Sequence, residues 1–377
     1  MEENFEEEFK VKRRVSTKPN KNIFLRIVIF LILIIVSIFV IGIFWYKNGL
    51  KHKKGIDDKT YFEIKENSTI KDLGKTLKEK GIIRSEKAFN IYTKLNDFNL
   101  INIGRYEAKK EQNLGEILDM VKNGKIYDSS INLRIPEGIT IEDLAKKVAK
   151  ETKISEQEML DTLRDKEYIQ SLCEKYWFMD EKEIFKKGLR EPLEGYIFPD
   201  TYKFDKETIN PKQIIEMSLI EMDKILTEQK ARIKEMTFNV HDILTLASII
   251  EKETTQNSDR QEVAGLFINR LNLNMSLGSD PTAHYEFKVP FTKELSMKEI
   301  NTKGKYNTRG PEMEGKLPIG PIATVSKSAI NSVLYYKKTD NVYFVSDKNG
   351  KIYFTKTLEE HEALVKKLKE NNMWHTY

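Results

Sequence analysis

Hydrophobic residues in this chain form one long uninterrupted run and many short periodic ones. From Ile27 to Tyr46, twenty residues carry no charge. A helix of that length, at about 1.5 Å per residue, spans a bilayer core of about 30 Å. Further along, apolar residues recur at helical spacing, and near the C-terminus they alternate as in strands. The pattern predicts a membrane helix at 27–46 followed by a mixed part of the α+β class.

Apolar runs also occur in cleaved signal peptides and in buried core helices. A signal peptide usually contains about 7–15 apolar residues followed by small ones. This run is longer and ends in Phe44, Trp45 and Tyr46, which suits an aromatic anchor at the membrane interface. Basic residues in the preceding tail, 1–26, slightly outnumber those that follow. We therefore expect an uncleaved anchor, a cytoplasmic N-terminus, and the rest of the chain outside the cell.

A short motif occurs twice after a polar linker at 47–59. IKENSTIKDL begins at Ile64 and IPEGITIEDL at Ile135, and a similar helix start lies at Asn113. Each copy predicts a short strand, a turn and a capped amphipathic helix. The chain therefore repeats one supersecondary unit within a membrane-proximal region that we place at 60–188.

The first copy belongs to a longer βααβ pattern. Strands are predicted at 61–65 and 104–109, and helices at 68–80 and 85–96. This is the element order of a LysM module, a small fold that binds glycans containing N-acetylglucosamine. The order does not separate a LysM-like glycan-binding region from a spacer domain, because fold does not fix function. Both alternatives stay open.

A second domain is placed at 189–377. The remaining elements that the sequence predicts are charged helices over 155–187, a long helix over 211–236, a buried helix over 240–253, strands at 342–346 and 352–355 around an Asn-Gly turn, and a last helix opened by a capping box at 357–360.

Composition narrows the chemistry. Cys173 is the single cysteine, so no intrachain disulfide forms, and the five histidines show no metal-ligand spacing. No serine-nucleophile or dinucleotide motif occurs, and we expect neither a metal nor a cofactor. A net charge of +5 is mild, and no basic block with interleaved aromatic residues indicates nucleic-acid binding. The chemistry that remains is acid–base catalysis by carboxyl side chains.

Two carboxylates end the helix predicted at 240–253. Glu251 and Glu253 each continue an apolar stripe of this helix. A carboxyl group against apolar neighbours has a raised pKa because desolvation disfavours the charged form, and the negative end of the helix dipole acts in the same direction. Such a group can serve as a general acid. The alternative is a pair of exposed glutamates at a frayed helix end, and periodicity does not choose between the two residues.

Rigid loops follow this helix. GSDPT begins at Gly278, YNT at Tyr306 and LPIGPI at Leu317. Asp-Pro and Gly-Pro steps define turns. Polar side chains on such loops either line a sugar-binding cleft or belong to tight connections within the fold.

Seven segments of the chain form a recognisable set, namely LEGYIFPDTYKF (193–204), LASIIEKET (246–254), VAGLFINRL (263–271), SDPT (279–282), YNT (306–308), LPIGPIA (317–323) and YFVSDKNGKIYFTKTLEEH (343–361). Together these segments resemble the endolytic murein transglycosylase family, also called YceG-like. They occur in the family's order and cover nearly everything after the linker.

The resemblance implies a membrane-anchored enzyme that cuts the β-1,4 bond between N-acetylmuramic acid and N-acetylglucosamine in peptidoglycan and leaves a 1,6-anhydro end. It assigns the catalytic acid to Glu251 and implies that the enzyme acts beside peptidoglycan synthases. The residues that we predict to contact the glycan strand are Glu253, Asp280, Thr282, Tyr306, Asn307, Thr308, Pro318 and Gly320.

The sequence departs from the family pattern at the proline-rich loop and after YNT. Lys316 is inserted, Ile319 replaces a proline, Thr324-Val325-Ser326 replaces Asn-Pro-Gly, and Arg309 stands where a tyrosine is common. Three other functions compete with this one: a tethered peptidoglycan-binding scaffold without catalysis, a pyridoxal-phosphate lyase, and a conventional glycan hydrolase. The lyase would need a cofactor lysine site that the sequence does not show.

Overall fold

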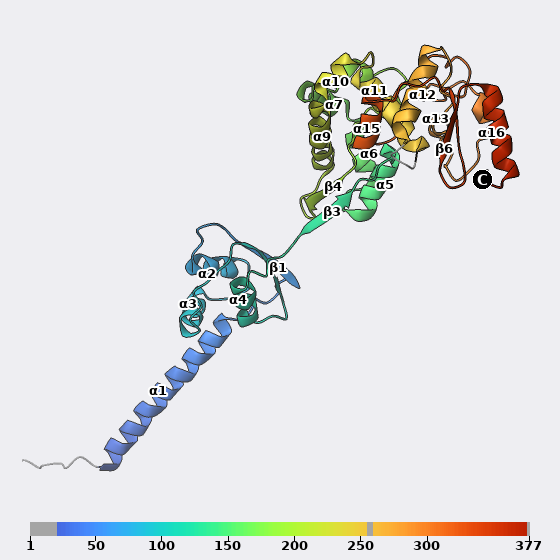
Figure 1. Ribbon diagram of the computed structural model, residues 1–377. Helices are drawn as coiled ribbons and strands as arrows, with labels where there is room; N and C mark the ends of the chain where they lie inside the picture. Colours follow the sequence, from blue (N-terminus) through green and yellow to red (C-terminus); the bar gives the residue numbers. More distant parts are fainter. Residues whose placement is uncertain (1–20, 255–258, 375–377) are drawn as a thin grey trace, which may run out of the picture. The chain divides into compact units, whose positions relative to one another are not determined.

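The structure is a computed structural model that describes residues 21–254 and 259–374 (Figure 1). Its contacts divide the chain into a first unit that ends at Asp128 and a second unit that begins at Ser129. Each unit has a hydrophobic core of its own. Of the predicted N-terminal tail, residues 1–20 lie outside the described part.

Helix α1 (Lys21–Gly49) contains the long apolar run. Within the described residues it is the one helix long and apolar enough to cross a membrane, with a mean hydropathy of 3.5 over its most apolar window. None of that window is buried inside the protein, so α1 is not the core helix of a soluble fold. Its exposed apolar side chains are compatible with a single membrane span.

The first unit has the predicted βααβ order. Its elements after α1 are β1 (Lys59–Ile64), α2 (Ile70–Glu79), α3 (Glu86–Leu95), β2 (Gly104–Lys109) and α4 (Leu114–Lys122). Strands β1 and β2 pair antiparallel with Phe62 opposite Tyr106, and both rings are buried in the core of this unit. The order agrees with the prediction, while the LysM-like function of this unit stays a prediction.

The sequence repeat corresponds to a structural repeat. Thr69 caps α2 and Thr140 caps the helix of the second copy, in each case by accepting a hydrogen bond from the backbone N–H three residues on. Asn113 caps α4 in the same way. These side chains satisfy N–H groups that have no partner within the helix, which is why the motif starts a helix each time.

The second unit is a mixed α+β assembly. Its elements are β3 (Ser130–Arg134), α5 (Ile141–Glu151), α6 (Glu156–Arg164), α7 (Lys166–Lys175), α8 (Glu181–Ile184), β4 (Thr201–Asp205), α9 (Pro211–Glu228), α10 (Lys230–Glu235), α11 (Val240–Glu253), α12 (Arg260–Asn272), α13 (Asp280–Phe287), α14 (Met297–Asn301), α15 (Lys327–Leu334), β5 (Tyr343–Ser346), β6 (Ile352–Thr355) and α16 (Leu358–Glu370). The strands pair antiparallel as β3 with β4 and β5 with β6.

The contacts place the boundary between units at residue 128, whereas the sequence placed it at 188. Strand β3 pairs with β4, with Leu133 opposite Tyr202, and α6 packs against α9. The apolar residues of α5, α6 and α7 therefore share one core with those of α9 and α11. Long-range strand pairing of this kind leaves no signal in local periodicity.

One predicted helix is divided in two. The segment 211–236 forms α9 and α10, which meet at Gln229. Beyond this break, the Arg232 Nε–H donates to the Leu334 carbonyl at 2.7 Å, and the Tyr335 hydroxyl donates to the Gln229 side chain at 2.7 Å. These contacts with the end of α15 lie at the break between the two helices.

Candidate active site

Helix α11 has the predicted bounds and the predicted burial. Asn239 caps it and forms a reciprocal capping box with Asp242. From His241 to Ile250 every residue but Asp242 is buried, because α12 and α15 pack against the helix (Figure 1). Both glutamates under consideration therefore project from the last turn of a rigid helix.

Glu251 lies in a buried ion pair. Its side chain is 4% exposed, and Oε1 lies 2.6 Å from Nη2 of Arg260, which is similarly buried. Oε2 accepts hydrogen bonds from the backbone N–H of Ser326 at 2.9 Å and from the Ser326 hydroxyl at 2.5 Å. Because Ser326 is the N-cap of α15, this carboxylate joins the end of α11 to the starts of α12 and α15.

Glu253 has different partners. Its Oε1 accepts a hydrogen bond of 2.6 Å from the Ser279 hydroxyl. Desolvation raises the pKa of this carboxyl to about 7, and the charge of Asp280 acts in the same direction. The Ser279 hydrogen bond and the positive charges of Arg309 and Arg270 oppose that rise in pKa. Near neutral pH this carboxyl is therefore protonated in a large share of molecules.

Thr282 and Thr308 hold the partner of Glu253 in place. The Ser279 N–H donates to Oγ1 of Thr308 at 2.9 Å, and the hydroxyls of Thr308 and Thr282 lie 2.8 Å apart. The Thr308 N–H donates to Oγ1 of Thr282 at 3.0 Å. All three residues are buried. The structure thus brings the two motifs together, and it places these hydroxyls in an internal network behind Glu253.

Tyr306 and Asn307 also belong to the interior. The Tyr306 hydroxyl accepts from the Arg190 N–H at 3.0 Å, and Nδ2 of Asn307 donates to the carbonyls of Glu299, Ile300 and Thr302. Both residues are buried. Their contacts shape the loop that carries Thr308.

Asp280 differs from these residues because it is open to solvent. Its side chain is 58% exposed and pairs with Arg309 at 2.8 Å, and Arg309 also donates to the Gly278 carbonyl. Thr282, Tyr306, Asn307 and Thr308 are buried, so among the polar loop residues predicted to contact substrate Asp280 is the one that is open to solvent.

Pro318 and Gly320 lie toward the other end of α11. His241, near the start of that helix, has its Nε2 3.0 Å from the Ile319 carbonyl oxygen, and a Cβ on Gly320 would meet the Leu189 side chain at 2.4 Å. Twelve residues of helix, about 18 Å, separate His241 from Glu253. The segment then follows α11, because the Ile322 N–H donates to Ser248 and that of Ser326 to Glu251. The proline loop thus supports the helix and is not grouped with Glu253.

A third carboxyl, Glu194, was not singled out by the sequence. It is 1% exposed, accepts the Ile141 N–H at 3.2 Å, and accepts a hydrogen bond from the Tyr285 hydroxyl at 3.1 Å. Desolvation raises its pKa to about 8. The one sequence signal was its place in LEGYIF, where an acidic residue sits among apolar ones.

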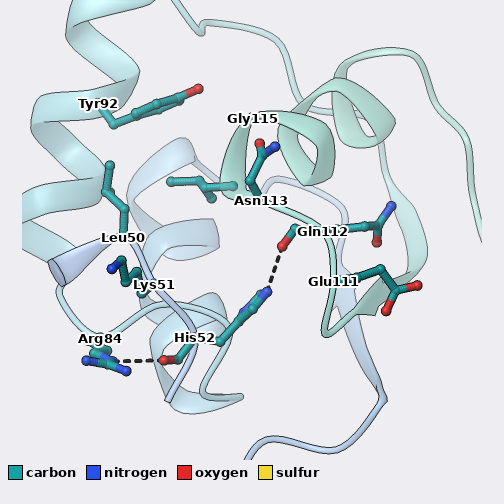
Figure 2. Close-up of a pocket in the computed structure, with 10 residues that line it drawn as sticks. Leu50, Lys51, His52, Arg84, Tyr92, Glu111, Gln112, Asn113 and Gly115 are labelled. Atoms are coloured by element: carbon teal, nitrogen blue, oxygen red, sulfur yellow. Dashed lines mark hydrogen bonds between the residues drawn. The ribbon is translucent and has the colours of Figure 1, made fainter. Parts of the chain in front are cut away.

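The first unit contains a cavity of about 510 Å³ beside the end of α1 (Figure 2). The His52 ring nitrogens lie 2.8 and 2.7 Å from the carbonyl oxygens of Ile82 and Gln112, and the Arg84 side chain donates to the His52 carbonyl and to Asn48. These polar groups fasten the chain leaving α1 onto the first unit. Their hydrogen-bonding capacity is used within the protein, so they do not indicate acid–base chemistry.

Comparison with known proteins identifies similar sequences and structures. The sequence pattern of the YceG-like family matches residues 62–367. An endolytic murein transglycosylase of Bacillus subtilis (strain 168) is 32% identical over 328 residues, which are 86% of this chain and 90% of that protein. An endolytic murein transglycosylase of Streptococcus pneumoniae serotype 2 is 30% identical over 318 residues, 80% of this chain and 57% of that protein.

A solved structure shares the fold. The crystal structure of a YceG-like protein from Listeria monocytogenes has a TM-score of 0.58 and 33% sequence identity, and the match covers 81% of this chain and 99% of that one. The family match includes α11 and every residue named above as a neighbour of Glu253.

Proposed function

Because this chain belongs to the YceG-like family, we propose that it is a membrane-anchored lytic transglycosylase that cuts peptidoglycan glycan strands internally. Relatives named endolytic murein transglycosylase, at 30 and 32% identity, support this general activity. The bond that we propose is the β-1,4 link between N-acetylmuramic acid and N-acetylglucosamine, and the product is a 1,6-anhydro end.

The observation that carries the proposal is the place of Glu253 at the end of α11, where its Oε1 accepts a hydrogen bond from Ser279 and desolvation raises its pKa to about 7. A general acid needs a pKa near the working pH and access to the leaving group. Both oxygens of Glu251 already accept hydrogen bonds, from Arg260 and from Ser326, so this carboxylate is less available to a leaving group. We therefore assign the acid to Glu253, although the family resemblance by itself placed it at Glu251.

In the proposed reaction Glu253 protonates the glycosidic oxygen as the bond to C1 breaks. The acetamide of the muramyl sugar assists at C1, and the Glu253 carboxylate then accepts the proton of the C6 hydroxyl. That oxygen bonds to C1 and displaces the acetamide oxygen, so the 1,6-anhydro ring closes without water and Glu253 is again protonated. One carboxyl suffices because the substrate supplies the second group, as in other substrate-assisted enzymes.

The anchor fits this substrate. Peptidoglycan lies outside the cytoplasmic membrane, so α1 would span the membrane with its N-terminus inside and both units outside. We assign catalysis to the second unit, and the first to glycan binding or spacing. Peptidoglycan synthases are the proposed neighbours of the enzyme.

Mass spectrometry of peptidoglycan incubated with the full-length chain in detergent tests the proposal. Wild-type protein and Glu251→Gln, once folded, should release anhydro-ended internal fragments, and Glu253→Gln should not. Fragments with reducing ends would indicate a hydrolase. If all three proteins bind strands and none cuts them, the chain would be a tethered peptidoglycan-binding scaffold without catalysis. Loss of cutting in folded Glu251→Gln alone would return the acid to Glu251.

A further inference from the structure

The first unit carries a group of exposed apolar side chains. They lie on α3, on the segment that joins α3 to β2, and just after α4, and we call them the apolar patch: Ile91, Leu95, Leu100, Ile103 and Ile126. Between 43 and 71% of each side chain is exposed. Single apolar residues are common on protein surfaces, whereas a group of them marks a site of interaction.

The segment 96–103 between α3 and β2 has an inner and an outer side. Phe98 and Ile101 pack against the core of the first unit. Leu100 and Ile103, which alternate with them along the chain, are exposed. The inner side therefore fixes the segment to the unit and leaves two apolar side chains outside.

The same segment contacts the end of α4. Nδ2 of Asn102 donates to the carbonyls of Val121 and Lys122 at 3.2 and 2.8 Å. At the start of β2, a Cβ on Gly104 would meet Cγ2 of Ile126 at 2.4 Å. The members of the apolar patch from α3, from the connecting segment and from behind α4 thus belong to one end of the unit.

Helix α3 runs back along the last turns of α1 (Figure 1). A Cβ on Gly49, the last residue of α1, would meet the Cβ of Ala88 at 2.7 Å. Three residues earlier on α1, Tyr46 is within range of electrostatic interaction with Tyr92, which is one turn later on α3. The two helices are therefore antiparallel here. Leu95 lies three residues further, about 4.5 Å, toward the apolar run of α1.

This position is the level of a membrane interface. The apolar run of α1 ends in three aromatic residues at 44–46, and aromatic side chains of this kind lie among lipid headgroups. The backbone N–H groups of Arg84 and Ser85 donate to the Gly49 carbonyl at 2.9 and 3.0 Å. Because these bonds fasten α3 to the end of α1, the apolar patch stays on the membrane side of the first unit.

The charge around the apolar patch is mainly positive. The exposed lysines near it, or just after the apolar run of α1, are Lys47, Lys51, Lys94, Lys122 and Lys125. Two carboxylates, Asp97 and Asp119, oppose them. Lysine side chains at a membrane surface are attracted to anionic headgroups, and apolar side chains between them enter the boundary with the acyl chains.

We propose that the apolar patch enters the headgroup region of the outer leaflet, while the lysines around it bind anionic lipids. The inference rests on the proposed function, since it takes from it that α1 spans the membrane with the first unit outside. It gives this unit a membrane contact of its own, whether the unit also binds glycan or acts as a spacer. The unit is then held on the bilayer surface and does not swing on a free tether.

The test measures the depth of single dyes on the full-length chain in vesicles of phosphatidylcholine and phosphatidylglycerol. Cys173→Ser removes the native thiol, and Leu100→Cys or Ile103→Cys then carries a polarity-sensitive dye. Lipids with a spin label on the headgroup should quench the emission of both dyes, and aqueous iodide should quench it little. The matched control is Leu358→Cys on α16, where the side chain is 52% exposed against 50% for Leu100. Its dye should be quenched by iodide and not by the lipids.

Dyes at Leu100 and Ile103 that behave like the dye at Leu358 overturn the proposal. Vesicles of phosphatidylcholine alone, or Lys122→Gln with Lys125→Gln, should reduce the quenching of the Leu100 dye by lipids. If both leave it unchanged, the binding of anionic lipids by the lysines is refuted.

A dye at Ile35→Cys, within the apolar run of α1, separates this inference from the proposed anchor. Lipids with a spin label deep in the acyl chain should quench it. If they do, and the dye at Leu100 reports only water, the anchor stands and the inference fails. If the dye at Ile35 is not quenched, the proposed anchor itself fails.

Discussion

Two glutamates on the last turn of α11, two residues apart, lie in opposite environments. The Glu251 carboxylate is buried against Arg260 and the start of α15, and both of its oxygens are bound by donors. Glu253 accepts a hydrogen bond from the Ser279 hydroxyl, and desolvation raises its pKa to about 7. The same side-chain chemistry thus yields a structural ion pair in one case and a group suited to donate a proton in the other.

The difference follows from what faces each side chain. A buried charge needs a partner of opposite charge, and Arg260 supplies it at the first residue of α12. Glu253 faces the loop of Ser279, where Asp280 and Arg309 pair with each other at the surface. Its proton affinity is therefore set by burial and is tuned by its neighbours. An acid catalyst needs a pKa close to the working pH, and the pKa of Glu253 is about 7.

The largest effect is expected from Glu253→Gln. Glutamine keeps the size of the side chain and the contact with Ser279 but has no proton to transfer, so kcat should fall about 1000-fold or more. The melting temperature should not fall, because a desolvated carboxyl is removed. Release of anhydro-ended fragments and thermal unfolding provide the two measurements. Substantial residual cutting would contradict the assignment.

Glu251→Gln should act on stability instead. It leaves the Arg260 guanidinium buried without a negative partner, which typically costs about 3–5 kcal/mol. Chemical denaturation should show this loss, and the double variant Glu251→Leu with Arg260→Met should recover part of it. Cutting per folded molecule should remain within about tenfold of wild type. A stable but inactive Glu251→Gln protein would indicate that Glu251 is the acid and that Glu253 is not.

Ser279→Ala should change the pKa of Glu253 while leaving the carboxyl itself in place. The hydroxyl donates to the carboxylate and so lowers the pKa of Glu253. Removing it should raise that pKa, and the alkaline decline of kcat/KM should move to higher pH, because the active form is the protonated one. A pH profile of strand cutting measures this shift. An unchanged profile would mean that Glu253 does not titrate in catalysis.

Substitutions in the surface pair of Arg309 and Asp280 should give the smallest shifts in the pH profile, and the two shifts should be opposite in sign. Arg309→Gln removes a charge that lowers the pKa of Glu253, so the alkaline decline should move up. Asp280→Asn removes a charge that raises this pKa, so the decline should move down. Both side chains are well exposed, and solvent screening keeps the shifts below that of Ser279→Ala. Shifts of the same sign would exclude a purely electrostatic role.

Much of the fold could be predicted because its signals are local. The bounds of α11, the caps at Thr69, Asn113 and Thr140, and the hairpin of β5 and β6 depend on neighbouring residues, and the structure agrees with them. The boundary at 128 and the break at Gln229 depend on partners far along the chain, so periodicity did not indicate them.

The candidate site shows the same division. Sequence motifs selected the end of α11 and the loops of Thr282 and Thr308, and the structure brings these loops together behind Glu253. Both threonines are buried in this structure, and their contact with substrate stays a prediction. Glu194 was missed because its partners, Ile141 and Tyr285, lie 53 and 91 residues away.

By itself the sequence determined an apolar helix long enough for a membrane, an α+β chain behind it, and a buried helix that ends in two glutamates. Only the tertiary structure gave those glutamates different surroundings. Helical periodicity places a side chain on a face, but its charge state depends on what packs against that face. Here Arg260 and Ser326 come to Glu251, while the loop of Ser279 comes to Glu253, whose carboxyl is desolvated.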